Sequence, residues 1–224
     1  QQPPVLVTRM RELGYQLGLF AAPGFTAPTD IERTVFAGIP GLPGERQDVS
    51  ALQRNRLVTE GWLEWLGRRD PARPFFGFLY YDPPMGEMDA ASAGPLPMDD
   101  RFTANPEARR AWRSYRQAIR TSDAEFARVL EDLGDRGLAE NTIVVALSDH
   151  GYEFDDNGQG YIGHASSFSP AQLRATLLVR WPGRPPTAYT HRTSHYDLPV
   201  TLLRDALGCT GDPADYAVGG DLFD

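Results

Sequence analysis

The stretch Thr142-Ile143-Val144-Val145-Ala146-Leu147-Ser148-Asp149-His150-Gly151 joins an apolar run to four residues of a different character. A short apolar run with polar boundaries predicts a buried strand. In open sheets of parallel strands the chemistry lies at the carboxyl ends of the strands, which is where Asp149 and His150 fall. Neighbouring side chains in a straight strand point to opposite faces. We therefore expect the strand to end between Asp149 and His150, with Gly151 permitting the turn that lets them converge.

An oxygen donor beside an imidazole suits a divalent metal such as Zn, Mn or Mg, and Ca less well. The sequence therefore predicts Asp149 and His150 as metal ligands. His164 follows one loop later, as a further ligand or as a donor to a substrate oxygen. Such a metal would polarise a phosphoryl or sulfuryl oxygen and lower the pKa of an attacking hydroxyl. The alternatives are an aspartate that caps a turn and a histidine that is solvated in a polar loop.

Strands and helices alternate along the chain, and most predicted strands are apolar on both faces. This pattern predicts an α/β fold with a largely parallel sheet flanked by helices. Asn105 suits the N-cap of the longest helix, and Pro106 suits its first position. The segments 83–105 and 152–170 have no clear period, so we expect loops there, the first as a long excursion that can cover the site. The expected strands are 15–21, 75–81, 142–147 and 175–181, and the expected helices are 5–13, 48–66, 105–133 and 197–207.

Composition bounds the class of protein. The 224 residues suit one domain, and their net charge of -8 gives no reason to expect nucleic-acid binding. The basic residues are all arginine, and the one cysteine, Cys209, excludes an intrachain disulfide. No apolar run approaches the roughly 18 residues of a membrane span, and the N-terminus lacks a signal-peptide pattern. We therefore expect the chain itself to be soluble.

Four arginines of the long predicted helix fall on one helical face, at steps of four, three and four residues. Their pattern suits a stripe that contacts anionic lipid headgroups. The alternative is a solvated face, with Asp123 and Glu125 following it. The stripe consists of Arg109, Arg113, Arg116 and Arg120, and the core candidates of the same helix are Trp112, Tyr115, Ile119 and Phe126.

Acidic residues gather beside the predicted site, at Glu153, Asp155 and Asp156. They would attract a cation, but a solvated loop explains them more simply. Two further histidines lie outside the site: we expect His195 to stabilise local structure at a helix start and His191 to lie on the surface.

Several sequence blocks occur in an order that characterises one family. Together they resemble the sulfatase branch of the alkaline phosphatase superfamily. Within that branch, the region from Glu153-Phe154 to Gln172-Leu173 is most similar to PbgA/YejM-like inner-membrane proteins, which join an N-terminal membrane domain to a periplasmic sulfatase-like domain. The blocks include Arg73-Pro74-Phe75-Phe76-Gly77-Phe78-Leu79, Asn141-Thr142-Ile143-Val144-Val145, Ser148-Asp149-His150-Gly151, Gly163-His164-Ala165-Ser166-Ser167-Phe168-Ser169, Trp181-Pro182-Gly183 and Ser194-His195-Tyr196-Asp197-Leu198.

The resemblance implies that residues 1–224 are the C-terminal part of one sulfatase-like domain, with the N-terminal part of the fold missing. It implies that Asp149 and His150 match the family's C-terminal metal pair, for Mn, Zn, Mg or Ca, and that His164 matches its later histidine. It also implies a role in regulating lipopolysaccharide and outer-membrane lipid balance at the periplasmic face of the inner membrane, with anionic lipid or lipid A as partner.

Departures from the family pattern bear on activity. Family enzymes carry an acid on the first strand and a Ser, Cys or Thr nucleophile on the next helix, and we expect both upstream of this chain. Pro84-Met85 stands where many members have a Pro-His pair. Two ligands alone should hold a metal weakly, so we expect the isolated chain to be inert. The alternatives are a metal-dependent phosphoryl or sulfuryl ester hydrolase when full length, and a site that serves structure alone. A sheet edge without its neighbouring strands also offers a route to self-association.

Overall fold

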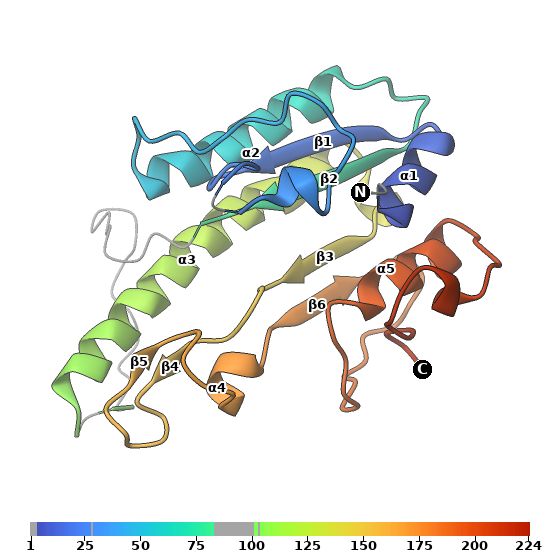
Figure 1. The fold of residues 1–224 in the computed structure, drawn as a ribbon. Coiled ribbons are helices and arrows are strands. Elements are labelled where there is room, and N and C mark those ends of the chain that lie inside the picture. Colours follow the sequence, from blue (N-terminus) through green and yellow to red (C-terminus); the bar gives the residue numbers. More distant parts are fainter. Residues whose placement is uncertain (1–3, 28, 83–100, 103) are drawn as a thin grey trace. The chain divides into compact units, whose positions relative to one another are not determined.

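The computed structural model describes residues 4–27, 29–82, 101–102 and 104–224 (Figure 1). The chain divides into two compact units. The first unit takes in residues 1–48, 60–80 and 186–224, and the second takes in residues 49–59 and 81–185. No helix in the described part of the chain combines the length and the apolar character needed to cross a bilayer.

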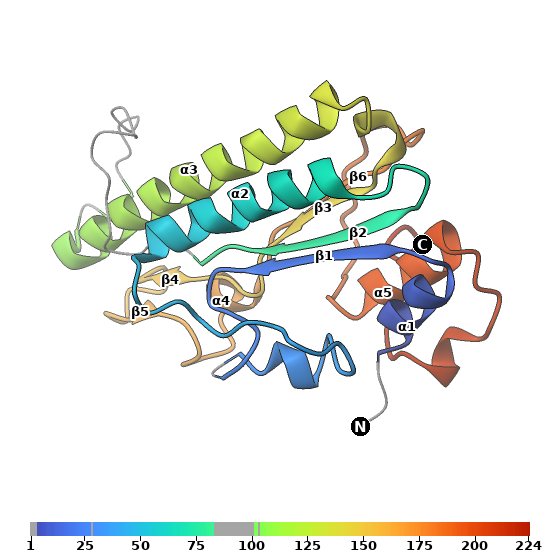
Figure 2. The same ribbon diagram turned by 90° about the horizontal axis from the view of Figure 1, so that it is seen from above.

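The first unit is built on two parallel strands, β1 (Gln16–Ala21) and β2 (Phe75–Tyr80). Figure 2 shows α2 (Ala51–Arg68) running along this pair, and its tryptophan side chains contact one face of the pair. A Cβ added at Gly77 would meet the Trp62 ring at 2.5 Å, and one added at Gly18 would meet the Trp65 ring at 2.7 Å. Glycine is required at both positions because the indole rings occupy that space.

The other face of the β1–β2 pair carries an apolar core. Phe25 and Phe36 are fully buried and meet edge to face, with ring centroids 5.8 Å apart. Val7 of α1 (Val5–Glu12) completes this cluster. A second cluster joins Met10 of α1 to Leu203, which lies in a π-helical turn (Leu202–Ala206) after α5 (Asp197–Thr201). The short 3-10 helices of this unit are η1 (Ile31–Arg33) and η4 (Pro213–Asp215).

The second unit contains the longest helix, α3 (Pro106–Asp135). Asn105 caps it, because its Oδ1 accepts hydrogen bonds from the Glu107 and Ala108 amides at 3.1 Å each. The predicted N-cap and the proline at the first position are therefore confirmed. A 3-10 helix (Ala139–Asn141) follows, and then β3 (Val144–Leu147), which pairs with β6 (Leu177–Arg180) in antiparallel fashion. β3 and β6 lie side by side in Figure 1.

Segment 152–170 is more ordered than the sequence predicts. It holds an antiparallel hairpin of β4 (Glu153–Phe154) and β5 (Ile162–Gly163), and α4 (Pro170–Leu173) begins at its end. Two-residue strands are too short to show a period, so a sequence pattern cannot reveal them.

An aromatic cluster joins this hairpin to α3. Phe154 is 3% exposed, and its ring centroid lies 5.1 Å from those of Trp112 and Tyr115 and 4.8 Å from that of Tyr152. Trp112 and Tyr115 thus contribute to the core, as predicted. The prediction for Ile119 is wrong, because that side chain is 48% exposed.

The predicted α/β architecture is confirmed, with element ends shifted by a few residues. The described strand pairs comprise one parallel pair, β1–β2, and two antiparallel pairs, β3–β6 and β4–β5. The predicted excursion at 83–105 and the departure at Met85 lie mostly outside the described residues, which exclude 83–100 and 103.

Candidate functional site

The predicted site lies just beyond the end of β3. The strand ends at Leu147, and Ser148 continues its pairing: the Ser148 amide donates to the Thr176 carbonyl at 3.0 Å, and the Thr176 amide donates to Ser148 Oγ at 2.8 Å. Asp149 and His150 both follow this last contact. The expectation that the strand ends between them is therefore wrong. They converge because both lie in the turn, where the alternation of a strand no longer applies.

Gly151 is required for a different reason from the one the sequence suggested. Its φ is not positive, so the turn does not demand a glycine. Instead, its amide donates to the Gln172 carbonyl at 2.9 Å, and a Cβ added there would lie 2.1 Å from the Ala171 carbonyl oxygen. The backbone of α4 therefore approaches too closely for any side chain at position 151.

The hydrogen bonds of His150 define its tautomer. Its Nδ1 lies 2.7 Å from the Gly151 carbonyl oxygen. A carbonyl oxygen only accepts, so Nδ1 carries the proton and the neutral ring keeps its lone pair on Nε2. That nitrogen faces Asp149 Oδ2 at 3.7 Å, while Asp149 Oδ1 accepts from the His150 amide at 2.9 Å. Two lone pairs thus face each other, and the space between them suits a metal ion.

A divalent metal fits this pair in part. An ion about 2.1 Å from each atom can lie between Nε2 and Oδ2. A backbone carbonyl that fixes the other ring nitrogen is the usual companion of a metal-binding histidine. Within the described residues, however, no three side chains of His, Cys, Asp or Glu converge to hold a metal. Asp149 and His150 can therefore supply two ligands, and the described residues add no third His, Cys, Asp or Glu side chain to them.

His164 lies against His150, as the sequence predicted for a shared site. Their rings are stacked, with centroids 4.4 Å apart and planes at 21°. Stacked rings direct their in-plane nitrogen lone pairs side by side rather than at one point, so this arrangement does not aim both imidazoles at one ion. The ring centroid of Tyr152 lies 5.7 Å from that of His164, and Tyr152 links His164 to the aromatic cluster. The side chains of Asp149 and His150 are 65% and 44% exposed, so the site is open to solvent.

The acidic residues beside the site differ in burial: Glu153 is buried, Asp155 is half-buried and Asp156 is exposed. Glu153 is only 3% exposed, and its carboxylate accepts from Asn157 Nδ2 at 2.7 Å, Ser169 Oγ at 2.7 Å and Gln172 Nε2 at 2.8 Å. These hydrogen bonds lower the pKa of Glu153, and the bond from Gln172 has the largest effect. Asp155 accepts from Asn105 Nδ2 at 2.7 Å, and this bond is the main cause of its lowered pKa. The solvated alternative is therefore wrong for Glu153.

The predicted arginine stripe is uneven. Arg113 and Arg120 are exposed, whereas Arg109 and Arg116 are half-buried. A hollow of about 270 Å³ at the start of α3 is lined by Pro106, Arg109, Arg113 and also Arg110, which the stripe left out. Further along α3, Arg128 pairs with Glu125 at 2.7 Å and Arg136 pairs with Asp132 at 2.7 Å. Among the described residues, Arg109, Arg110 and Arg113 have no such carboxylate partner.

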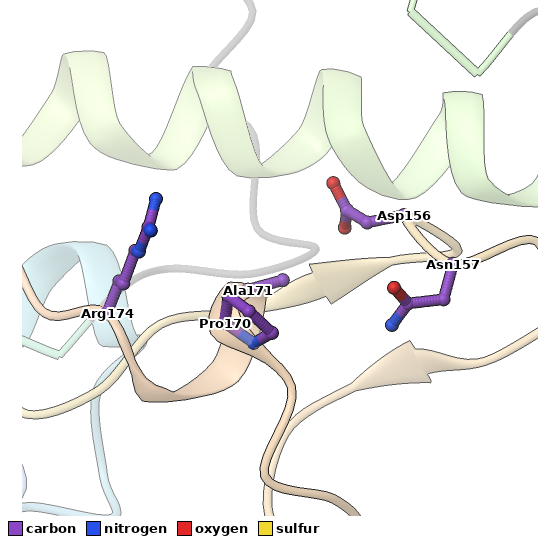
Figure 3. Close-up of a pocket in the computed structure, with 5 residues that line it drawn as sticks. All are labelled: Asp156, Asn157, Pro170, Ala171 and Arg174. Carbon is purple, nitrogen blue, oxygen red and sulfur yellow. The ribbon is translucent and has the colours of Figure 1, made fainter.

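A second hollow, of about 330 Å³, lies where the β4–β5 connection meets α4. Figure 3 shows Asp156 and Arg174 on opposite sides of Pro170 and Ala171. Asp156 also accepts from the Phe154 amide at 2.8 Å, so it shapes the hairpin. None of Asp149, His150 and His164 lines this hollow.

The remaining histidines belong to the first unit and lie on its surface. His191 Nε2 is 3.2 Å from the Leu222 carbonyl oxygen. The residue that sequence reasoning missed is Gln172, a buried amide in contact with both histidine-bearing loops. Gln172 lies in the region whose sequence resembles the sulfatase branch, but a lone glutamine does not by itself indicate a chemical role.

An acid and a histidine that follow a strand in an α/β fold form a candidate metal-binding pair, and the family follows from comparison. Residues 5–208 match the Sulfatase family, so this chain belongs to the sulfatase family. The chain is 26% identical over 222 residues to the inner membrane protein YejM of Salmonella typhimurium, covering 99% of the chain and 33% of that protein. It is 30% identical over 131 residues to the steryl-sulfatase of Rattus norvegicus, covering 52% of the chain and 22% of that protein.

Solved structures confirm the fold. The phosphonate monoester hydrolase of Agrobacterium radiobacter superposes with a TM-score of 0.63 at 19% identity, covering 98% of this chain and 60% of that one. A 4S-sulfatase of Bacteroides thetaiotaomicron gives a TM-score of 0.56 at 19% identity, covering 88% and 52%. The chain spans about a third of the length of the YejM relative. The fold is therefore that of the sulfatase branch, and the chain is YejM-like.

Proposed function

We propose that this chain is part of the periplasmic domain of a YejM-like inner-membrane protein, in which the sulfatase fold recognises anionic lipid rather than turning over an ester. The name of the YejM relatives supports the inner membrane. The periplasmic face, the membrane anchor outside this chain and the role in lipopolysaccharide balance belong to the proposal. The observation that carries it is the half-built centre, in which Asp149 and His150 present two lone pairs and no third His, Cys, Asp or Glu side chain among the described residues joins them.

The arginines at the start of α3 are the proposed lipid contact. Within the described part of the chain no carboxylate pairs with them, and the helix dipole does not account for them either, because the N-terminal end of a helix favours anions rather than cations. Asn105 already caps the amides of Glu107 and Ala108, so a bound anion would be held by side chains. Guanidinium groups match the oxygens of a phosphate headgroup. The hollow between Arg109, Arg110 and Arg113 offers space for such a group, and Arg116 and Arg120 extend the contact along α3.

Vesicle flotation with lipid A, compared with phosphatidylcholine, tests this contact. Each arginine near an anionic surface contributes about 1 kcal/mol, so the variant R109A/R110A/R113A should bind roughly 100-fold more weakly. The control R9A/R46A/R68A removes the same charge from arginines that pair with Glu12, Asp48 and Glu64. It should bind about as well as the wild type. Equal binding by all three proteins would remove the arginines from the proposal.

A metal-dependent phosphoryl or sulfuryl ester hydrolase is the second candidate, for a longer protein that contains this chain. The favouring observation is the fixed tautomer of His150 opposite Asp149. These two residues would hold the metal, and His164 would donate to a substrate oxygen. The metal, when bound, polarises that oxygen and lowers the pKa of the nucleophile. Asp149→Ala in the longer protein should then abolish turnover, and an unchanged rate would rule this candidate out.

A further inference from the structure

Gln172 contacts both loops that carry the site histidines. Its backbone carbonyl accepts from the Gly151 amide at 2.9 Å, one residue after His150. Its side-chain Oε1 accepts from the Ser166 amide at 3.1 Å and the Ser167 amide at 3.3 Å, just after His164. The residue is 4% exposed, so water does not compete freely for these bonds. One residue of α4 therefore anchors the loop at 149–151 and the loop at 163–167.

Glu153 determines which way the Gln172 amide points. The ionised carboxylate of Glu153 only accepts, and Gln172 Nε2 donates to it at 2.8 Å. The Gln172 oxygen must then face the amides of Ser166 and Ser167. A flipped amide would set oxygen against carboxylate and NH₂ against N–H, which leaves the groups on both sides without partners. The lowered pKa of Glu153 keeps it in the acceptor form.

The loop at 163–167 needs this support because its backbone is strained. Ala165 has φ 62°, a left-handed conformation that alanine rarely adopts. The conformation is held from both sides: Tyr161 Oη donates to the His164 carbonyl at 2.8 Å, and Gln172 accepts from the next amide. Released from these bonds, Ala165 would return to an ordinary conformation and carry the His164 ring away from His150.

We infer that Gln172, oriented by Glu153, is the positioning residue that holds His164 on His150. The inference rests on the proposed function only where it concerns the role of the paired histidines. The geometry itself can be tested without any ligand.

The test is an exchange of the two side chains in the full 224-residue chain. Gln172→Glu places two carboxylates at the Glu153–Gln172 contact and should separate them. The double variant E153Q/Q172E restores a matched donor and acceptor at the contact between positions 153 and 172, while the Ser169 hydroxyl changes from donor to acceptor. The new amide at position 153 would donate to the new carboxylate at position 172 and accept from Asn157, and that carboxylate would accept from the amides of Ser166 and Ser167. Ser169→Ala removes another bond to Glu153 without touching Gln172, and is the matched control.

The readouts are the nuclear Overhauser contact between the two imidazole rings and the exchange rates of the Ser166 and Ser167 amides, at neutral pH. Q172E should lose the ring contact and speed amide exchange by about tenfold, the change expected for one lost hydrogen bond. E153Q/Q172E and Ser169→Ala should keep both. A ring contact that persists in folded Q172E, or a double variant that fails to recover it, would overturn the inference. If the contact follows the prediction while lipid binding and turnover do not change, the inference stands and the proposed role of the histidines fails.

Discussion

Replacing Gly151 with alanine should be among the most damaging small changes near the site. The added Cβ would lie 2.1 Å from the Ala171 carbonyl oxygen and 2.8 Å from that of Arg174. An ordinary carbon–oxygen contact is about 3.3 Å, so the two backbones must part by roughly 1.2 Å. Both obstacles are backbone atoms, which cannot rotate away as a flexible side chain would.

The cost of Gly151→Ala combines two effects. Overpacking costs about 1–3 kcal/mol, and loss of the hydrogen bond from Gly151 to Gln172 costs about 1 kcal/mol more. The sum, about 2–4 kcal/mol, corresponds to a fall in melting temperature of roughly 4–16 °C for a chain of this size.

Thermal melting followed by circular dichroism measures this effect, with Gly134→Ala as control. Gly134 lies in α3 with no atom within 4 Å of an added Cβ, so alanine there should stabilise the helix by about 0.5–1 kcal/mol. A Gly151→Ala variant that melts with the wild type would refute the close approach between α4 and the site turn.

Three further predictions concern the second unit. Phe154→Ala should lower the free energy of unfolding by about 3–5 kcal/mol, measured by urea denaturation, because Phe154 is 3% exposed at the centre of the aromatic cluster. Hydrogen bonds lower the pKa of Glu153, and the bond from Gln172 has the largest effect. The stability that the ionised Glu153 side chain adds is therefore present above the unfolded pKa of about 4.3 and is lost as pH falls through the lower folded value. Acid unfolding of Glu153→Gln should therefore show a shallower loss of stability below about pH 4.3 than the wild type, and equal slopes would contradict this. We also propose that the chain self-associates through the β3–β6 pair, where Leu178 is 65% exposed. Leu178→Glu should abolish concentration-dependent association in sedimentation experiments. Association that survives in this variant would place the contact elsewhere.

The sequence predicted the elements whose signals are local. The apolar run before Ser148 became β3, and Asn105 with Pro106 began α3 as their capping chemistry requires. These features depend on residues within a few positions of one another. The sequence also named His164 as a candidate for the site of Asp149 and His150, and the structure stacks the His164 ring on that of His150, although His164 follows β5 rather than β3.

Features that depend on distant contacts were missed. Gly151 is required by the backbone of α4, some twenty residues later, and no pattern around Gly151 contains that information. The sequence around Glu153 does not distinguish it from a solvated acidic residue. Only its contacts with Ser169 and Gln172 in the folded chain show that it is buried. Arg110 also lines the basic hollow, although it lies outside the four-three-four spacing on which the predicted stripe was based.

The most direct test of the central claim is a turnover assay on the purified chain. Simple phosphate and sulfate monoesters would be supplied with Mn²⁺, Zn²⁺, Mg²⁺ or Ca²⁺ in turn, beside Asp149→Ala as control. The account predicts that no metal raises the rate of the wild type above that of the control. Metal-dependent turnover that Asp149→Ala abolishes would contradict it, and would show that the site formed by Asp149, His150 and His164 is catalytic.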